Sequence, residues 1–235
     1  MAFLSGWQED TSRPTAKEAG RDLAVRALAP LVVWWLVVVG MGWLLTDGPL
    51  KDLGVSENSV SKSLESSRTA FGDAVTLFFS WTGATVSILG VCLVVVVLVW
   101  RRTKQWWFAV VPLIAISLQG MVFFFTQLLI VRERPDVEKL DNSAPTSSFP
   151  SGHTGAATAL YFTLGLMALR ITNRVLRTVV VSVCVAVPFL VATARLYRGM
   201  HFLSDVVVAI LNGSVAALLA WCWLRRSDGE DQTRA

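Results

Sequence analysis

The most constraining feature of this sequence is a series of long apolar stretches that carry almost no charge. Because lipid offers no hydrogen-bond partner to a backbone amide, a segment that crosses a bilayer must satisfy its own backbone, which takes a helix of roughly 20 mostly apolar residues. Hydrophobic residues make up 54% of the chain and the mean hydropathy is +0.55, as expected for a protein dissolved in a membrane. Six stretches are long enough to be predicted spans: 27–45, 74–100, 106–131, 153–169, 178–194 and 203–224.

The sequence therefore predicts an all-α, polytopic membrane protein whose six transmembrane helices form one bundle. It shows neither an internal repeat nor a low-complexity linker, so a single membrane domain is expected over residues 1–235. Residues 1–26 are charged and lack the apolar core of a cleavable signal, which makes them a cytoplasmic segment. The six-helix bundle then occupies residues 27–224, and residues 225–235 form a cytoplasmic tail.

The distribution of positive charge gives the expected topology. A formal net charge of +4 raises the possibility of nucleic-acid binding, so the positions of the cations have to decide. If the amino terminus is cytoplasmic, 13 of the 21 Lys and Arg residues fall on the inner side. The positive-inside rule thus places both termini in the cytoplasm and the protein in the plasma membrane, with no nucleic-acid partner. The inner residues are Arg13, Lys17, Arg21, Arg26, Arg101, Arg102, Lys104, Arg170, Arg174, Arg177, Arg225, Arg226 and Arg234.

The predicted outer loop over residues 46–73 joins the first two spans. It mixes Ser and charged residues with scattered Leu, Val and Phe. Two interpretations fit this composition: a solvated connection that contains an interfacial helix, or a lid over a lipid-binding mouth.

Both histidines of the chain fall at the outer mouth of a predicted span. A lone histidine at a helix end is usually a capping or interfacial residue, but two on one side, each accompanied by arginines, favour a catalytic pair. Asp205 follows His201 by four residues, so the two side chains share one face of a helix that has begun by there. A carboxylate in that place can accept the Nδ1 proton and leave Nε2 free to act as a nucleophile. The second histidine, His153, starts the fourth predicted span.

Two arginines and a tetrapeptide at the same mouth suggest an anion site. The guanidinium groups of Arg134 and Arg195 keep their charge and can bind phosphate oxygens bidentately, although headgroup anchoring also explains an arginine there. The tetrapeptide 150–153 reads Pro-Ser-Gly-His at a helix start, where unpaired backbone amides bind anions. Gly152 allows close approach of the backbone and Ser151 adds a hydroxyl donor, while the alternative is a simple turn before a helix.

These residues together resemble the type 2 phosphatidic acid phosphatase family, whose signature has three parts. The second part, Pro-Ser-Gly-His, is complete at residues 150–153. The third part is Ser-Arg, five residues, His, three residues and Asp. It is matched by Arg195, His201 and Asp205, with Ala194 in place of the leading Ser. The resemblance covers about half of the chain, from the third to the sixth predicted span, and the spacing of these two motifs is highly specific.

The first part of the signature, Lys, six residues and then Arg-Pro, is matched less well. Arg134 is followed by Pro135, but Gln127 stands at the position of the Lys. This substitution removes one cation from the expected phosphate site and leaves a neutral amide that can donate a hydrogen bond. Arg132 or Arg198 could supply the missing charge. The expected consequence is an altered substrate preference or a lower activity.

The resemblance implies a metal-independent phosphatase without a cofactor. In the family's two-step route, His201 attacks phosphorus to give a phosphohistidine, His153 protonates the departing oxygen, and water then breaks the intermediate. Asp205 orients the nucleophile. One neutral and one protonated imidazole also divide these roles on chemical grounds alone. The groups expected to bind phosphate are Arg134, Arg195, Ser151, Gly152, Gln127 and Arg132.

A lipid phosphate is the expected substrate and the membrane the expected surroundings. A site at the outer, extracytoplasmic mouth of a bundle can receive a headgroup while the tail lies among apolar side chains such as Phe123, Phe124 and Phe125. Phosphatidate, phosphatidylglycerol phosphate and a polyprenyl diphosphate all fit this description. The sequence does not decide between them.

Four alternatives remain open at this stage. The first is a phosphotransferase that uses the same pocket, and the second is a catalytically impaired family member. The third is a metal hydrolase that uses the histidines with Asp136, Glu138 or Asp141, although no paired metal-ligand spacing is visible. The fourth is a channel or transporter, which should carry polar groups near the bilayer midplane. Asn212 is the main interior polar side chain, and a hydrogen bond between helices explains it.

Overall fold

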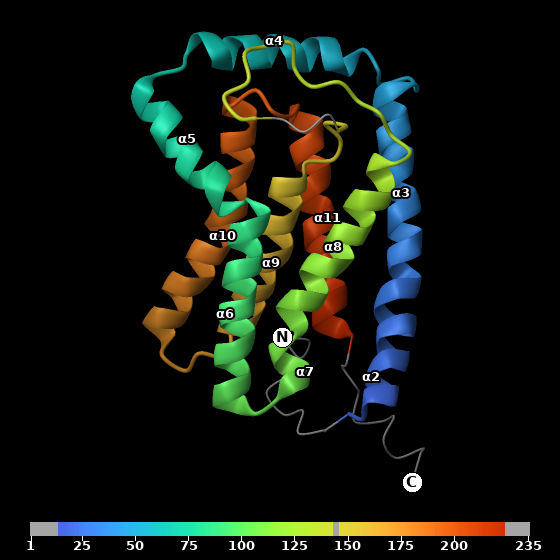
Figure 1. Cartoon of the computed structure of the whole chain (residues 1–235), viewed down its shortest axis with the longest axis vertical. Helices are drawn as coiled ribbons and strands as arrows, with labels where there is room; N and C mark the ends of the chain where they lie inside the picture. The colour runs from blue at the N-terminus through green and yellow to red at the C-terminus, as the bar shows by residue number, and fades with distance from the viewer. Residues whose placement is uncertain (1–13, 143–145, 224–235) are drawn as a thin grey trace.

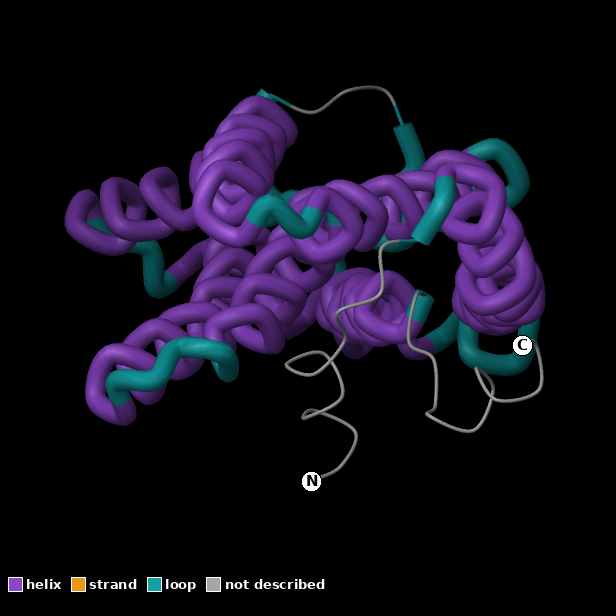
Figure 2. Tube along the Cα trace, turned by 90° about the horizontal axis from the view of Figure 1, so that it is seen from below, coloured by secondary structure: helices purple, strands orange, loops and turns teal. Residues whose placement is uncertain are grey.

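The computed structural model describes residues 14–142 and 146–223. Within these ranges the only regular secondary structure is helical, as predicted (Figure 2), and the longest connection runs from the end of α8 at Gln127 to the start of α9 at Gly152. The helices are α2 (Ala16–Leu23), η1 (Ala24–Leu28), α3 (Ala29–Thr46), α4 (Leu53–Ser66), α5 (Ala70–Thr82), α6 (Thr85–Thr103), α7 (Trp106–Ala109), α8 (Val111–Gln127), α9 (Gly152–Ala168), α10 (Arg174–Tyr197) and α11 (Leu203–Cys222). The predicted tail, residues 225–235, and residues 1–13 of the predicted segment 1–26 lie outside the described residues.

Helix α9 is the central element of the bundle. It packs against α8, α10 and α11, and its buried face consists of small and hydroxyl-bearing residues. Where α9 meets α11 the backbones come very close, because a Cβ atom on Gly213 would lie only 2.6 Å from the carbonyl oxygen of Gly155. Small residues of this kind allow membrane helices to pack tightly. Asn212 accepts a hydrogen bond from Trp34 Nε1 (3.1 Å) and donates one to the Gln119 carbonyl (3.4 Å), so it makes the predicted bond between helices.

Four of the helical segments are long and apolar enough to cross a membrane, and α8 is a shorter apolar helix. The four are Ala16–Thr46, Thr85–Thr103, Arg174–Tyr197 and Leu203–Cys222. These segments include three of the predicted spans nearly in full and the second half of another. They establish a helical protein with several candidate spans.

The predicted second span, 74–100, is wrong as a single helix. It consists of the end of α5 and most of α6, separated at Gly83 and Ala84. At this break the chain passes close to α9 and α10: a Cβ atom on Gly83 would lie 2.7 Å from Val191 Cγ1 and 3.3 Å from His153 Cβ. The break therefore carries α5 outward at an angle towards α4, as Figure 1 shows.

Helix α4 lies across one end of the bundle, above the loops that precede α9 and α11 (Figure 1). It lies within the loop 46–73, for which the sequence allowed either an interfacial helix or a lid. Helix α2 begins, and α11 ends, at the opposite end of the bundle (Figure 1).

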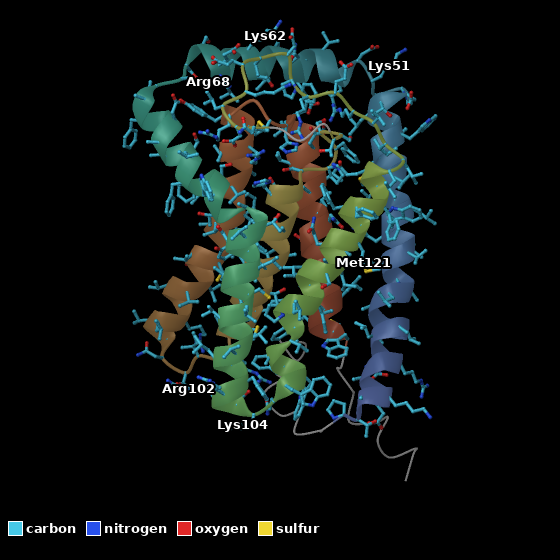
Figure 3. All side chains as sticks on the ribbon, viewed as in Figure 1. Lys51, Lys62, Arg68, Arg102, Lys104 and Met121 are labelled. Atoms are coloured by element: carbon cyan, nitrogen blue, oxygen red, sulfur yellow. The ribbon has the colours of Figure 1, made fainter. Side chains whose placement is uncertain are left out.

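The labelled cations divide between the two ends of the bundle. Lys51, Lys62 and Arg68 lie at the α4 end, whereas Arg102 and Lys104 lie at the opposite end (Figure 3). Loops assigned to different sides of a membrane from the sequence are therefore at different ends of the molecule.

Candidate active site

A cavity of about 580 Å³ brings most of the predicted site residues together. Its polar part is formed by side chains and backbone from the loops beneath α4 and from the first turn of α9. Its apolar part runs between α6 and α8. The polar part is lined by Gln127, Arg134, Asn142, Thr146, Ser147, Gly152, His153, Arg195 and His201. The apolar part is lined by residues that include Ile88, Leu89, Leu113, Ile116, Phe123 and Ala156.

His201 lies in the short loop between α10 and α11 and is almost completely buried. Its Nδ1 atom is 2.7 Å from the carbonyl oxygen of Ser148. A carbonyl can only accept a hydrogen bond, so Nδ1 carries the proton and the lone pair is on Nε2. The predicted tautomer is therefore present. The acceptor is a backbone carbonyl, because the nearest oxygen of Asp205 lies 3.8 Å from Nδ1, beyond hydrogen-bond distance.

Asp205 acts on His201 through its charge and through its contacts at the start of α11, directly after the loop that carries His201. It is fully buried in the first turn of α11, where Oδ2 accepts the backbone N–H of Phe202 (2.9 Å) and Oδ1 accepts Nη1 of Arg132. Burial lowers the pKa of the His201 imidazole, and this effect outweighs the opposing influence of the Asp205 carboxylate. The neutral imidazole is thus favoured at neutral pH.

Arg195 lines the cavity from the last turn of α10 and is held by an acidic residue that the sequence did not single out for this purpose. Its Nη1 donates to Asp141 Oδ2 (2.6 Å) and to Ser80 Oγ (2.7 Å). The Nε atom is buried and has no hydrogen-bond partner within the described residues. Nη1 of Arg195 thus donates to a carboxylate oxygen of Asp141, as it could donate to an oxygen of a bound phosphate.

Asp141 is shared between two arginines. Its other oxygen accepts Nε of Arg198 at 2.8 Å. Although burial raises the pKa of the Asp141 carboxyl, the hydrogen bond from Arg198 and the charge of Arg195 outweigh that effect and hold the pKa below its ordinary value. The carboxylate therefore stays ionised and competes with any anion for Arg195.

Arg134 combines a place in the cavity wall with a contact to the nucleophile's loop. Its Nη1 donates to the carbonyl oxygen of Met200 at 2.7 Å, and Met200 directly precedes His201. Arg134 thereby fixes the backbone on which the imidazole stands, while the rest of the guanidinium lines the cavity.

The tetrapeptide 150–153 forms the first turn of α9, as predicted. Ser151 is buried and its hydroxyl caps the helix by accepting the N–H of Thr154 and donating to the Thr154 hydroxyl at 3.0 Å. The amides of Gly152 and His153 belong to the helix start, where backbone N–H groups have no acceptor within the helix. Gly152 packs against Phe123, whose ring would lie 3.0 Å from an added Cβ atom. The backbone and His153 face the cavity, whereas the Ser151 hydroxyl is committed to the cap.

Gln127 lies in the cavity wall but uses its amide to hold a loop. Its Nε2 donates to the carbonyl oxygens of Ser147 (3.0 Å) and Phe149 (3.3 Å), on either side of the carbonyl that binds His201. Both N–H groups are thus engaged, which differs from the expected donation to phosphate.

Arg132 and Arg198 were the two candidates for the missing cation. Neither belongs to the described residues that line the cavity. Arg132 is bound to Glu57, Ser204 and Asp205, and Arg198 is bound to Asp141 and neighbouring backbone oxygens. We therefore do not include Arg132 among the phosphate-binding groups, because its guanidinium is already paired with two carboxylates.

Three residues of the site were not predicted from the sequence: Ser148, Glu57 and Ser80. Ser148 contributes only a carbonyl, which no motif can signal, and the other two come from α4 and α5, more than fifty residues away from their partners. Asp141 was considered only as a metal ligand. In residues 14–142 and 146–223, no group of three or more His, Cys, Asp and Glu residues is arranged to hold a metal ion.

Comparisons with known proteins agree with the motifs. The model of the PAP2 superfamily matches residues 108–228, which extend from α7 through α11. A phosphatidylglycerolphosphate phosphatase of PAP2 type from Bacillus subtilis superposes with a TM-score of 0.69 at 20% identity, over 88% of this chain and 96% of that one. LpxE from Aquifex aeolicus superposes with a TM-score of 0.55 at 20% identity, over 69% and 92% of the two chains. Comparison with curated protein sequences gives no match. The family match covers more than half of the chain, which therefore belongs to the PAP2 superfamily, and this confirms the family and the phosphatase class predicted from the motifs.

Proposed function

We propose that this protein is a lipid phosphate phosphatase of the plasma membrane that works through a phosphohistidine on His201. The observation that carries the proposal is a single cavity in which two histidines and two arginines meet an apolar groove. The substrate is a phosphomonoester or diphosphate of a lipid.

In the first step, Nε2 of His201 attacks phosphorus while the bond from phosphorus to the lipid oxygen breaks. His153 gives its proton to that oxygen, and the alcohol or lipid phosphate leaves. The proton stays on Nδ1, which donates it to the carbonyl oxygen of Ser148, and this hydrogen bond stabilises the cationic phosphoimidazole. In the second step, His153 removes a proton from water, the water oxygen attacks phosphorus, and the bond to Nε2 breaks to release phosphate.

Charge on the transferred phosphoryl group is stabilised by Arg134, Arg195 and the amides at the start of α9. The buried Nε of Arg195, which has no partner among the described residues, is one donor available for a phosphate oxygen. Electrostatic stabilisation of this kind is the largest contribution in phosphoryl transfer. The loss of the family's Lys at Gln127 leaves these groups as the main source of positive charge.

A lipid tail fits the apolar part of the cavity. Its wall follows α8 from Gln127 to Leu113, about 21 Å at a rise of 1.5 Å per residue, which exceeds the roughly 15 Å half-thickness of a bilayer core. Phe123 lines this groove, whereas Phe124 and Phe125 are about half exposed on the outside of the bundle. The structural similarity to a phosphatidylglycerolphosphate phosphatase from Bacillus subtilis supports phosphatidylglycerol phosphate as one candidate substrate.

The proposed topology has six spans, both termini in the cytoplasm and the α4 end outside. It is supported by the positions of Arg102 and Lys104 at the end opposite α4 (Figure 3). In this arrangement the cavity receives its substrate from the outer leaflet.

The test is phosphate release by the purified protein in detergent. Phosphatidate, phosphatidylglycerol phosphate and a polyprenyl diphosphate are assayed side by side, with and without a chelator. We expect release from at least one substrate, unchanged by the chelator. Activity that depends on an added divalent ion, or transfer of labelled phosphate to another lipid with little free phosphate, would contradict the proposal.

Replacement of Asp141 should strengthen binding of inorganic phosphate. In Asp141→Asn, Arg195 loses a charged competitor, so we expect the inhibition constant of inorganic phosphate to fall about 3- to 10-fold, the effect of one charge-assisted hydrogen bond. The measurement is product inhibition at constant ionic strength. Asp136→Asn is the matched control, because the side chain of Asp136 is 89% exposed and forms a surface ion pair with Lys62. An unchanged or higher inhibition constant in Asp141→Asn would show that Asp141 helps to place Arg195.

A further inference from the structure

Glu57 connects α4 to the beginning of α11. It lies with Ser61 on the buried face of α4, whose other residues are exposed or half-buried. Its carboxylate accepts the backbone N–H of Ser204 at 2.6 Å and the Ser204 hydroxyl at 2.9 Å. The same carboxylate accepts Nη2 of Arg132 at 2.9 Å. Glu57 therefore holds the helix that carries Asp205, and it also holds the arginine that binds Asp205.

Arg132 completes a buried chain of charges that ends at the nucleophile. One of its terminal nitrogens binds Glu57 and the other binds Asp205, while the guanidinium stacks 4.6 Å from the ring centroid of Phe202. Glu57, Arg132 and Asp205 are 7%, 7% and 0% exposed. Buried charges of this kind persist only when each is paired, so the three groups form one unit.

The charge on Asp205 matters because of its distance from His201. At 3.8 Å from Nδ1, an unpaired carboxylate would attract a proton to the imidazole and turn the nucleophile into an imidazolium. The other ionisable groups that influence His201 are Arg195 on α10, Arg134 in the loop after α8 and His153 on α9, and positive charge on any of them opposes its protonation. Asp205 is thus the group that favours protonation, and Arg132 is the cation bound directly to it.

We propose that Glu57 and Arg132 are positioning residues that keep His201 in its neutral, attacking form by taking up the charge of Asp205. Arg132 neutralises the carboxylate, and Glu57 fixes Arg132 from α4. In this proposal α4 helps to position the nucleophile. It is therefore neither a passive interfacial helix nor a lid that moves. The proposal rests on the proposed role of His201 as the nucleophile.

The decisive experiment measures the titration of His201 directly. The chain has only two histidines, so in a His153→Gln background, expressed without a histidine tag, the single ¹⁵N-histidine NMR signal reports His201. We expect Arg132→Gln to raise the midpoint of this titration by about one pH unit or more. Glu57→Gln leaves Arg132 in place but removes the negative charge that pairs with it, so it should lower the midpoint slightly, and the double variant should lie at or slightly below Arg132→Gln. Lys62→Gln, which removes an exposed cation from the same helix, is the matched control.

Kinetics with His153 intact give the second readout. The acidic limb of kcat/KM for a soluble phosphomonoester should move to higher pH by the same amount in Arg132→Gln, with little change in KM and with activity recovered at alkaline pH. Arg132→Lys should restore most of the original profile. A uniform loss of activity at all pH values with an unchanged NMR midpoint would overturn the proposal.

Outcomes that concern folding or the proposed function can be told apart. Glu57→Gln keeps the idea testable where Arg132→Gln does not fold, because Gln retains the shape of the side chain and can still accept hydrogen bonds. The NMR midpoint does not depend on turnover. A shifted midpoint in a protein that releases no phosphate from any of the three lipid substrates would therefore support the positioning role of Arg132 and Glu57 and contradict the proposed function.

Discussion

The His201→Ala variant is expected to lose at least about 10⁴-fold in kcat, because its phosphoryl acceptor is gone and water would have to attack the lipid phosphate directly. His201 lines the cavity, and the hydrogen bond from its Nδ1 to the carbonyl of Ser148 leaves the lone pair on Nε2. The measurement is release of phosphate from the best lipid substrate. A parallel sample with labelled substrate is quenched during turnover and denatured. The wild-type protein should then carry an acid-labile phosphate, and the variant should carry none.

Controls for this variant have to separate chemistry from folding. His201 is buried, so its removal leaves space next to Phe202 and Met200; thermal unfolding and gel filtration must match the wild type before rates are compared. His201→Asn fills more of that space and should be equally inactive. Labelled phosphate that persists on either variant would move the nucleophile to another residue.

Local patterns allowed much of the fold to be predicted from the sequence. Apolar length alone locates α3, α10 and α11, because a helix that crosses a bilayer has to match its thickness, whereas the predicted span 106–131 is divided between α7 and the shorter apolar helix α8. The break at Gly83 could not be anticipated, since nothing in the composition of 74–100 indicates that the chain must pass within contact distance of Val191 and His153. That constraint comes from tertiary packing, which overrides a continuous apolar pattern.

The candidate site also contains residues that the sequence motifs predict and partners that they do not predict. The motifs correctly predicted that His153, His201, Arg134 and Arg195 lie close together, and all four line one cavity, from α9, α10 and the loops next to them. Their partners could not be assigned, because a contact such as that of Arg132 with Glu57 joins positions 75 residues apart and has no periodic signal.

Asp205 shows that the spacing of a motif predicts the position of a residue but not its hydrogen-bond partners. A spacing of four residues correctly placed Asp205 near His201. It could not reveal that Arg132 and the N–H of Phe202 occupy the two oxygens of the carboxylate. The spacing of a motif therefore predicts which groups are neighbours, while their hydrogen-bond partners depend on the rest of the fold.

His153→Gln should produce a loss whose size depends on the leaving group. For an alkyl phosphate such as phosphatidate, removal of the general acid should lower kcat by about 10²- to 10⁴-fold, because an unprotonated alkoxide is a poor leaving group. For p-nitrophenyl phosphate the first step should be much less affected, since nitrophenolate leaves without a proton. The measurement is kcat for both substrates with the wild type and the variant.

The second step provides an independent check on the same variant. His153 is also expected to remove the proton from water, so the phosphohistidine should form from p-nitrophenyl phosphate and then break down slowly. The variant should therefore show a burst of nitrophenolate that approaches one equivalent, together with more acid-labile phosphate per protein than the wild type carries at steady state. Equal losses with both substrates and no burst would mean that His153 only binds phosphate. The acid would then have to be another group in the cavity wall, and because His153 and His201 are the only histidines of the chain, it would not be a histidine.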